Sequence, residues 1–80
     1  MKLKILAFGI TKDIFGTSQQ EITIKDAITV QQLKSILEEE FPELKKLTSY
    51  FIAVNEEYAE EDQMITETDE IAIIPPVSGG

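Results

Sequence analysis

Cysteine, histidine and tryptophan are absent from this chain. Without cysteine it forms no disulfide, no thiolate metal site and no cysteine nucleophile. Without histidine it lacks the side chain that proteins use most often as a general base and as a metal ligand. Aspartate and glutamate are present, but their spacing matches no recognisable metal-binding loop. We therefore expect no metal and no cofactor to be bound by this chain.

Long apolar runs are also missing. No run approaches the about 20 residues that a membrane-spanning helix needs. Residues 1–5 alternate polar and apolar side chains, unlike the core of a signal peptide. We expect a cytoplasmic protein with no membrane partner.

Positive charge is scarce, because seven basic residues face fifteen acidic ones, for a net charge of −8. Residues 1–37 hold five lysines and three acids, net +2, whereas residues 38–80 hold two lysines and twelve acids, net −10. Such a surface repels phosphate backbones, so we expect no nucleic-acid partner. The acidic half can serve solubility alone or steer the chain toward a basic partner surface.

The first half of the chain predicts a hairpin followed by a helix. Residues 1–8 alternate as a strand that places Leu3, Ile5 and Ala7 on one face. Residues 9–16 form a break with room for one helical turn, and residues 21–25 form a second strand that turns Ile22 and Ile24 inward.

The spacing of apolar residues changes from alternation to a helical period at the main helix. Thr29 and Gln32 fit a capping box, in which the Thr side chain caps the helix and the Gln reaches back. The apolar side chains that follow recur at helical spacing, and Pro42 ends the helix at about Glu40. We expect this apolar stripe to pack in the core rather than bind a cofactor. The stripe consists of Val30, Leu33, Ile36, Leu37 and Phe41.

The second half predicts short strands and turns. They are a polar connection at 43–48, a strand at 49–54, a turn at 55–57, a very short strand at 58–59, a segment at 64–65 that points back toward the core, a turn at 66–69 and a last strand at 70–74.

Because the first and last strands are both rich in core residues, we place them side by side and parallel at the sheet centre. This is an α+β fold of the ubiquitin-like β-grasp type, with a mixed sheet of four or five strands and one main helix across one face. We assign residues 1–76 to one domain and residues 77–80 to a flexible tail.

The end of the chain, IIPPVSGG, concentrates proline and glycine. Pro75 and Pro76 fix φ and project the tail away from the sheet as a stiff spacer. Gly79 and Gly80 have no Cβ, so they form a thread thin enough for a narrow channel. A bare terminal carboxylate on a domain without histidine or cysteine suggests a chain that is acted upon. Activation by ATP to an acyl-adenylate would allow sulfur to give a thiocarboxylate or an amine to give an amide conjugate, and the spacing does not choose between them.

Several motifs in the sequence resemble those of one family. Residues 53–55, AVN, and residues 68–80, TDEIAIIPPVSGG, closely resemble the small subunit of molybdopterin synthase. The opening strand and the segment FGITKDIFG at 8–16 resemble that family's aromatic, basic-acidic and glycine pattern. The likeness in layout covers the whole chain.

This resemblance implies a β-grasp fold and a sulfur-carrier role. In that family an E1-like enzyme uses ATP to adenylate the terminal glycine, and a sulfurtransferase system converts it to a thiocarboxylate. The tail then enters the large synthase subunit, where the sulfur passes to cyclic pyranopterin monophosphate during molybdenum cofactor biosynthesis. Two small and two large subunits form the usual assembly.

By position, the resemblance makes Gly80 the sulfur-bearing residue and Gly79 the thin segment behind it. Phe8 and Lys12 become candidates for the docking face, although Phe8 also fits an ordinary core aromatic and Lys12 an ordinary solvated lysine. The residues expected to line the entry to the partner are Pro75, Pro76, Val77 and Ser78.

One feature departs from the family pattern. The turn before the last strand usually has the sequence Asp-Gly-Asp-Glu, whereas this chain has Glu-Thr-Asp-Glu at residues 67–70. We expect the loss of glycine at Thr68 to change the geometry or strain of the turn without affecting the tail.

Three alternatives remain open. One is a sulfur carrier of another pathway, such as thiazole synthesis for thiamin, although such carriers are typically shorter and lack the Pro-Pro-Val-Ser lead. Another is a ubiquitin-like modifier joined by its terminus to protein lysines. The third is a β-grasp binding module without terminal chemistry.

Overall fold

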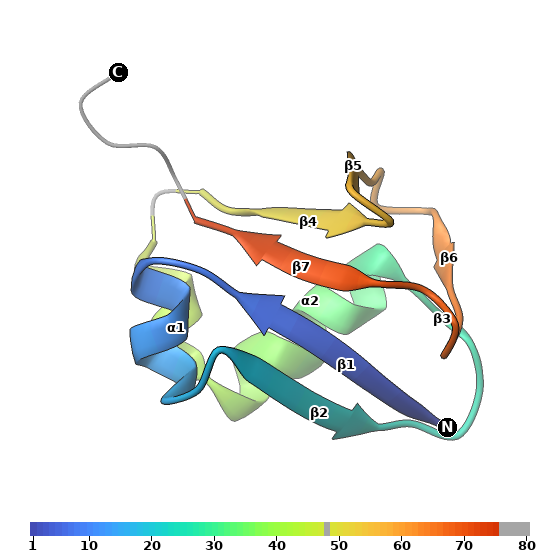
Figure 1. Ribbon diagram of the computed structural model, residues 1–80, viewed down its shortest axis with the longest axis horizontal. Coiled ribbons are helices and arrows are strands. Elements are labelled where there is room, and N and C mark those ends of the chain that lie inside the picture. Colours follow the sequence, from blue (N-terminus) through green and yellow to red (C-terminus); the bar gives the residue numbers. More distant parts are fainter. Residues whose placement is uncertain (48, 76–80) are drawn as a thin grey trace.

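The structure, a computed structural model, describes residues 1–47 and 49–75. The strands and helices are arranged around one main sheet (Figure 1). In order, the elements are β1 (Lys2–Ala7), α1 (Ile10–Phe15), β2 (Gln19–Thr23), β3 (Ile28–Thr29), α2 (Val30–Glu40), the 3-10 helix η1 (Pro42–Lys46), β4 (Phe51–Val54), β5 (Glu57–Tyr58), β6 (Met64–Ile65) and β7 (Ile71–Ile74).

The main sheet has the strand order β2-β1-β7-β4-β5. β1 and β7 run parallel, with Ile5 opposite Ile71 and Ala7 opposite Ile73. All other neighbours in this sheet are antiparallel. The predicted placement of the first and last strands, adjacent and parallel in the middle of the sheet, is therefore confirmed.

The core lies between this sheet and α2, which crosses one face (Figure 1). The alternating pattern of β1 turns Leu3, Ile5 and Ala7 into this core, as predicted. Leu33 and Leu37 of α2 are fully buried against them. Burying side chains of this kind contributes about 1.5–3 kcal/mol each before the loss of entropy is subtracted.

The predicted capping box of α2 is present. The backbone N–H of Gln32 donates to Thr29 Oγ1 at 3.1 Å, and the backbone N–H of Thr29 donates to Gln32 Oε1 at 2.8 Å. The helix ends at Glu40, two residues before Pro42, as the sequence predicts.

The polar connection predicted at 43–48 is wrong in one respect. Residues Pro42–Lys46 form η1, and Leu44 is fully buried. Pro42 favours this turn because its fixed φ suits a first helical position, where a missing N–H leaves no bond unmade. A single apolar residue among charged neighbours gave no periodic signal, so the contribution of this segment to the core was missed.

Two short elements form a second, two-stranded sheet. β3 pairs antiparallel with β6, with Ile28 opposite Ile65. Ile65 is fully buried, which confirms the predicted return of residues 64–65 toward the core, whereas Met64 is exposed. The second predicted strand is displaced by two residues, since β2 spans Gln19–Thr23 and Ile24 packs against the core beyond its end.

The turn that lacks the family glycine forms without strain at Thr68. The backbone N–H of Asp69 donates to the carbonyl of Thr66 at 3.0 Å, and the N–H of Thr66 donates back to Asp69 Oδ2 at 2.9 Å. Within residues 1–47 and 49–75, only Asn55 and Glu56 are non-glycine residues with positive φ. Thr68 therefore does not adopt the positive φ that favours glycine, and the expected change of turn geometry relative to the family stays a prediction.

In the part of the chain that the structure describes, no helix is long and apolar enough to cross a membrane.

Candidate functional site

The predicted reactive end lies outside the described residues. This applies to Pro76, Val77, Ser78, Gly79 and Gly80. Pro75 is the last described residue and directly follows β7, so the structure shows where the tail begins.

The base of the tail lies against the turn between β1 and α1. Gly9 in this turn has φ 55° and ψ −130°, a conformation that side chains rarely adopt. A Cβ placed on Gly9 would lie 3.4 Å from Pro75 Cγ, which is the tight end of van der Waals contact. The turn therefore favours glycine through its φ, and an added Cβ would come into van der Waals contact with Pro75.

Phe8 lies at the end of β1, just before this turn, and half of its side chain area is exposed. Its backbone is held by the fully buried Thr11, whose hydroxyl donates to the Phe8 carbonyl at 2.6 Å and accepts the Phe8 N–H at 3.0 Å. Phe8 is thus a fixed surface aromatic and not a core residue. This position agrees with the predicted docking role, which stays a prediction.

Lys12, the second docking candidate, is exposed on α1. It does not line the pocket that contains Phe8. Within residues 1–47 and 49–75 the only ion pair joins Lys34 to Glu61 at 4.0 Å. Lys12 is therefore close to Phe8 in the sequence, but it does not line the same pocket.

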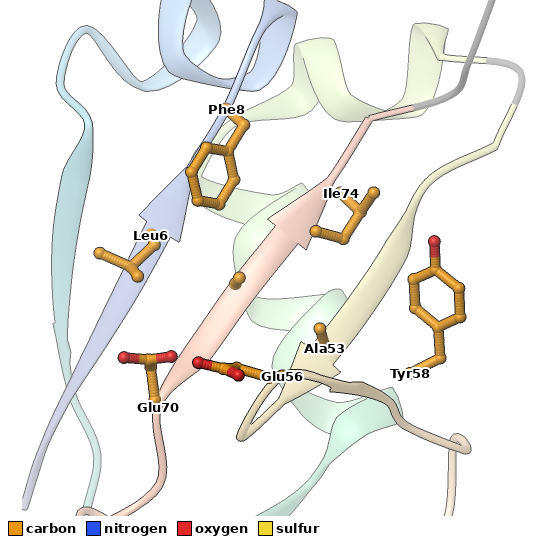
Figure 2. A pocket seen from close by; sticks show the side chains of 8 residues that line it. Leu6, Phe8, Ala53, Glu56, Tyr58, Glu70 and Ile74 are labelled. Atoms are coloured by element: carbon orange, nitrogen blue, oxygen red, sulfur yellow. The ribbon is translucent and has the colours of Figure 1, made fainter.

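A pocket of about 450 Å³ opens on the face of the sheet that α2 leaves uncovered (Figure 2). It lies beside the last residue of β7, one residue before Pro75. Its lining residues come from β1, β7, β4 and β5 and their ends, and they are Leu6, Phe8, Ala53, Glu56, Tyr58, Glu70, Ala72 and Ile74.

Apolar side chains dominate this uncovered face near the tail. Phe51 and Tyr58 are 51% and 71% exposed, and their ring centroids lie 5.3 Å apart. Exposed apolar groups gathered on one face of a small protein mark a protein–protein interaction site more often than scattered ones do. We call this face, from Leu6 and Phe8 across Ile74 to Phe51 and Tyr58, the docking face.

Sequence reasoning missed most of the docking face, although a signal was present. Lys2 and Lys4 occupy the outward positions at the start of β1, and the same register continues outward through Leu6 and Phe8. An apolar residue at an outward position breaks the alternation of a half-exposed strand. The break occurs at the end of β1 that lies beside the tail.

A polar cluster lies on the helical side of the molecule. The Tyr50 hydroxyl donates to the Glu38 carboxylate, and Lys34 Nζ lies 5.1 Å from the centre of the Tyr50 ring. Burial and, next, the Glu38 carboxylate raise the pKa of Tyr50 well above its ordinary value. The cluster fastens α2 to the segment before β4.

Metal binding has no support in the described part of the chain, because no group of three or more Asp or Glu side chains there is placed to hold an ion.

The architecture defines the class of protein. A mixed five-stranded sheet crossed by one main helix, with the first and last strands parallel at its centre, is a ubiquitin-like β-grasp. Solved structures share it: the small archaeal modifier protein 1 of Haloferax volcanii matches with a TM-score of 0.80 at 19% identity, covering 95% of this chain and 98% of that one. A Pyrococcus furiosus protein described as molybdopterin converting factor subunit 1 matches with a TM-score of 0.85 at 22% identity, covering 96% and 99%.

The chain belongs to the ThiS family, whose model matches residues 5–80. It is 40% identical to the molybdopterin synthase sulfur carrier subunit of Dictyostelium discoideum, over 99% of this chain and 96% of that protein. It is 35% identical to the human protein of the same name, over 99% and 94%. A solved complex of subunits 1 and 2 of the molybdopterin-converting factor from Helicobacter pylori contains a chain that is 25% identical, with a TM-score of 0.68 and full coverage of both chains.

Proposed function

We propose that this chain is the sulfur carrier subunit of a molybdopterin synthase. The observation that supports this best is full-length likeness to curated carrier subunits at up to 40% identity. The family match extends through residue 80, so it includes the Gly-Gly end. In this proposal the folded body delivers the terminal carboxyl, and the active site belongs to the large subunit.

The chemistry takes place at Gly80. Its carboxylate attacks the α-phosphorus of ATP on an E1-like enzyme, and pyrophosphate leaves, giving an acyl-adenylate. A sulfur nucleophile from a sulfurtransferase system replaces AMP, giving a C-terminal thiocarboxylate. That sulfur then passes to cyclic pyranopterin monophosphate on the large subunit. ATP is used by the activating partner, and this chain binds no cofactor.

The docking face explains how the body could present the tail. Phe8 and Ile74 lie on it at the end where Pro75 begins. Aromatic side chains in a central, desolvated position contribute most to the binding energy of many interfaces. A large subunit seated on this face would therefore lie next to Pro75, the last described residue before the tail. The complex of subunits 1 and 2 from Helicobacter pylori supports a partner of this kind.

The activation step can be tested by intact mass. We expect the chain, incubated with its E1-like enzyme, ATP and a sulfur source, to gain the mass difference of one oxygen exchanged for one sulfur. Omitting ATP is the control and should leave the mass unchanged. Higher-mass conjugates that resist reduction, in place of this shift, would contradict the carrier function.

Such conjugates would favour the second candidate, a ubiquitin-like modifier. Its support is the likeness to the Haloferax volcanii modifier, which at 19% identity concerns the fold alone. The closer identity to molybdopterin synthase carriers favours sulfur transfer. The cytoplasmic location and the assembly of two small and two large subunits stay predictions.

A further inference from the structure

The docking-face pocket has both apolar and acidic lining residues. Most of its wall is apolar, but Glu56 and Glu70 line one end, and in Figure 2 their carboxylates point toward one another. Between this end and Tyr58 lie two small residues, Ala53 and Ala72, which are direct cross-strand partners on β4 and β7. The pocket thus combines an apolar floor with two acidic groups and is lined by no lysine.

A hydrogen-bonded turn holds the acidic end in place. The N–H of Asn55 donates to the Glu70 carbonyl at 2.7 Å, and the Glu70 N–H donates to Asn55 Oδ1 at 2.9 Å. The Asn55 side-chain amide also donates to Asp69 Oδ1 at 3.0 Å. Because these bonds tie Asn55 to residues 69–70, the neighbouring Glu56 is held beside Glu70, and two like charges share one end of the pocket.

We propose that this pocket receives one arginine or lysine side chain of the large synthase subunit. The aliphatic stem of that side chain would cover Ala53 and Ala72, and its cation would lie between Glu56 and Glu70. The inference rests on the proposed function, and it names a specificity contact that the function alone does not supply.

Two observations favour this occupant. The first is charge complementarity, because a long basic side chain is apolar along its stem and positive at its end, as the pocket requires. The second is continuity with the tail base, since Ile74 lines the same pocket and directly precedes Pro75. The partner that seats the tail therefore lies over this pocket at the same time.

The conformation of Glu56 agrees with a role outside the fold. Asn55 and Glu56 form a two-residue hairpin loop between β4 and β5 with φ of 54° and 70°. The second position of such a loop most often holds glycine, which adopts positive φ without strain. A glutamate is retained where glycine would suit the fold better, as expected if its carboxylate is needed by a partner.

The test is a binding measurement with the large synthase subunit and the full chain. We expect Glu56→Gln combined with Glu70→Gln to weaken the equilibrium affinity by about tenfold or more, mainly through faster dissociation, as loss of a desolvated charge contact does. The matched control combines Glu39→Gln and Glu40→Gln, which remove the same charge from exposed positions on α2. The control should change the affinity by less than about twofold.

A third variant separates binding from folding. Glu56→Gly removes the carboxylate but suits the backbone conformation, so we expect its melting temperature to equal or exceed that of the natural chain while dissociation from the large subunit becomes faster. Faster dissociation without loss of stability supports recognition. A lower melting temperature with unchanged dissociation shows a purely structural glutamate and overturns the inference.

Two further results would overturn the inference. In the first, the pocket variants bind the large subunit with the same affinity as the control pair. In the second, the pocket variants bind only the E1-like enzyme more weakly. In both cases the natural chain still binds the large subunit and still transfers sulfur, so the proposed function stands. Failure of the natural chain to bind the large subunit at all would instead remove the proposed function and this inference together.

Discussion

Gly9 lies in the turn between β1 and α1, next to Pro75 at the base of the tail. At φ 55° and ψ −130° a side chain would be strained, and its Cβ would meet Pro75 Cγ at 3.4 Å. We expect Gly9→Ala to lower the free energy of unfolding by about 1–3 kcal/mol and to place a methyl group in van der Waals contact with Pro75 at the tail base. Chemical denaturation measures the first effect, and the rate of sulfur transfer measures the second.

Gly16 provides the matched control. It also has positive φ, at 76°, but nothing lies within 4 Å of a Cβ built on it. Gly16→Ala should therefore cost only backbone strain, about 1–2 kcal/mol. At a temperature where both variants remain folded, Gly9→Ala should transfer sulfur more slowly than Gly16→Ala. Equal rates would show that the contact with Pro75 does not position the tail.

Tyr50 makes the stability depend on pH in the alkaline range. Its pKa is raised by burial and by Glu38, so the folded state favours the neutral phenol. The stabilisation is complete below the unfolded pKa of about 10 and is lost as the pH rises toward the folded pKa. We expect the free energy of unfolding to fall more steeply above about pH 10 for the natural chain than for Tyr50→Phe. Parallel curves for the two proteins would contradict this.

At the scale of elements, η1 acts as part of the core through Leu44. This side chain is fully buried, whereas Leu6 on the docking face is only partly buried. We expect Leu44→Ala to lower the free energy of unfolding by about 2–5 kcal/mol, the range for a leucine removed from a packed core. Leu6→Ala should cost less stability but weaken binding to the large subunit. Similar losses of stability from both substitutions would argue against η1 as a core element.

The elements that could be predicted are those with a local physical signal. Strand β1 alternates, and α2 begins with a capping box formed by Thr29 and Gln32, so both were predicted with errors of one or two residues. Leu44 was missed because one apolar residue between charged ones has no period. The hydrogen bond from Tyr50 to Glu38 was missed because it joins residues twelve apart whose approach depends on tertiary packing.

The candidate site could be predicted only in part for the same reason. Phe8 was recognised by resemblance, but its pocket joins residues from four strands that are distant in sequence. Glu56 and Glu70 lie fourteen residues apart in the sequence but line the same pocket, next to the hydrogen bonds between Asn55 and Glu70. The Gly-Gly end, in contrast, could be proposed as the reactive end from the sequence, because recognising it requires no tertiary contacts.

At the scale of the whole molecule, the two faces of the main sheet have different roles. One face is covered by α2 (Figure 1) and forms the core, and the other carries the docking face (Figure 2). The parallel pair β1 and β7 places Phe8 and Pro75 at the same end of the sheet. All core residues in the described part of the chain precede Pro75, and we therefore expect stability and delivery of the terminal carboxyl to be separable.

This separation is tested most directly by deleting Gly80 and measuring sulfur transfer to cyclic pyranopterin monophosphate with the large subunit. We predict that the shortened chain unfolds at the same denaturant concentration as the natural chain and produces no molybdopterin. Normal pterin sulfuration by the shortened chain would contradict the central claim that the terminal carboxyl of Gly80 carries the sulfur.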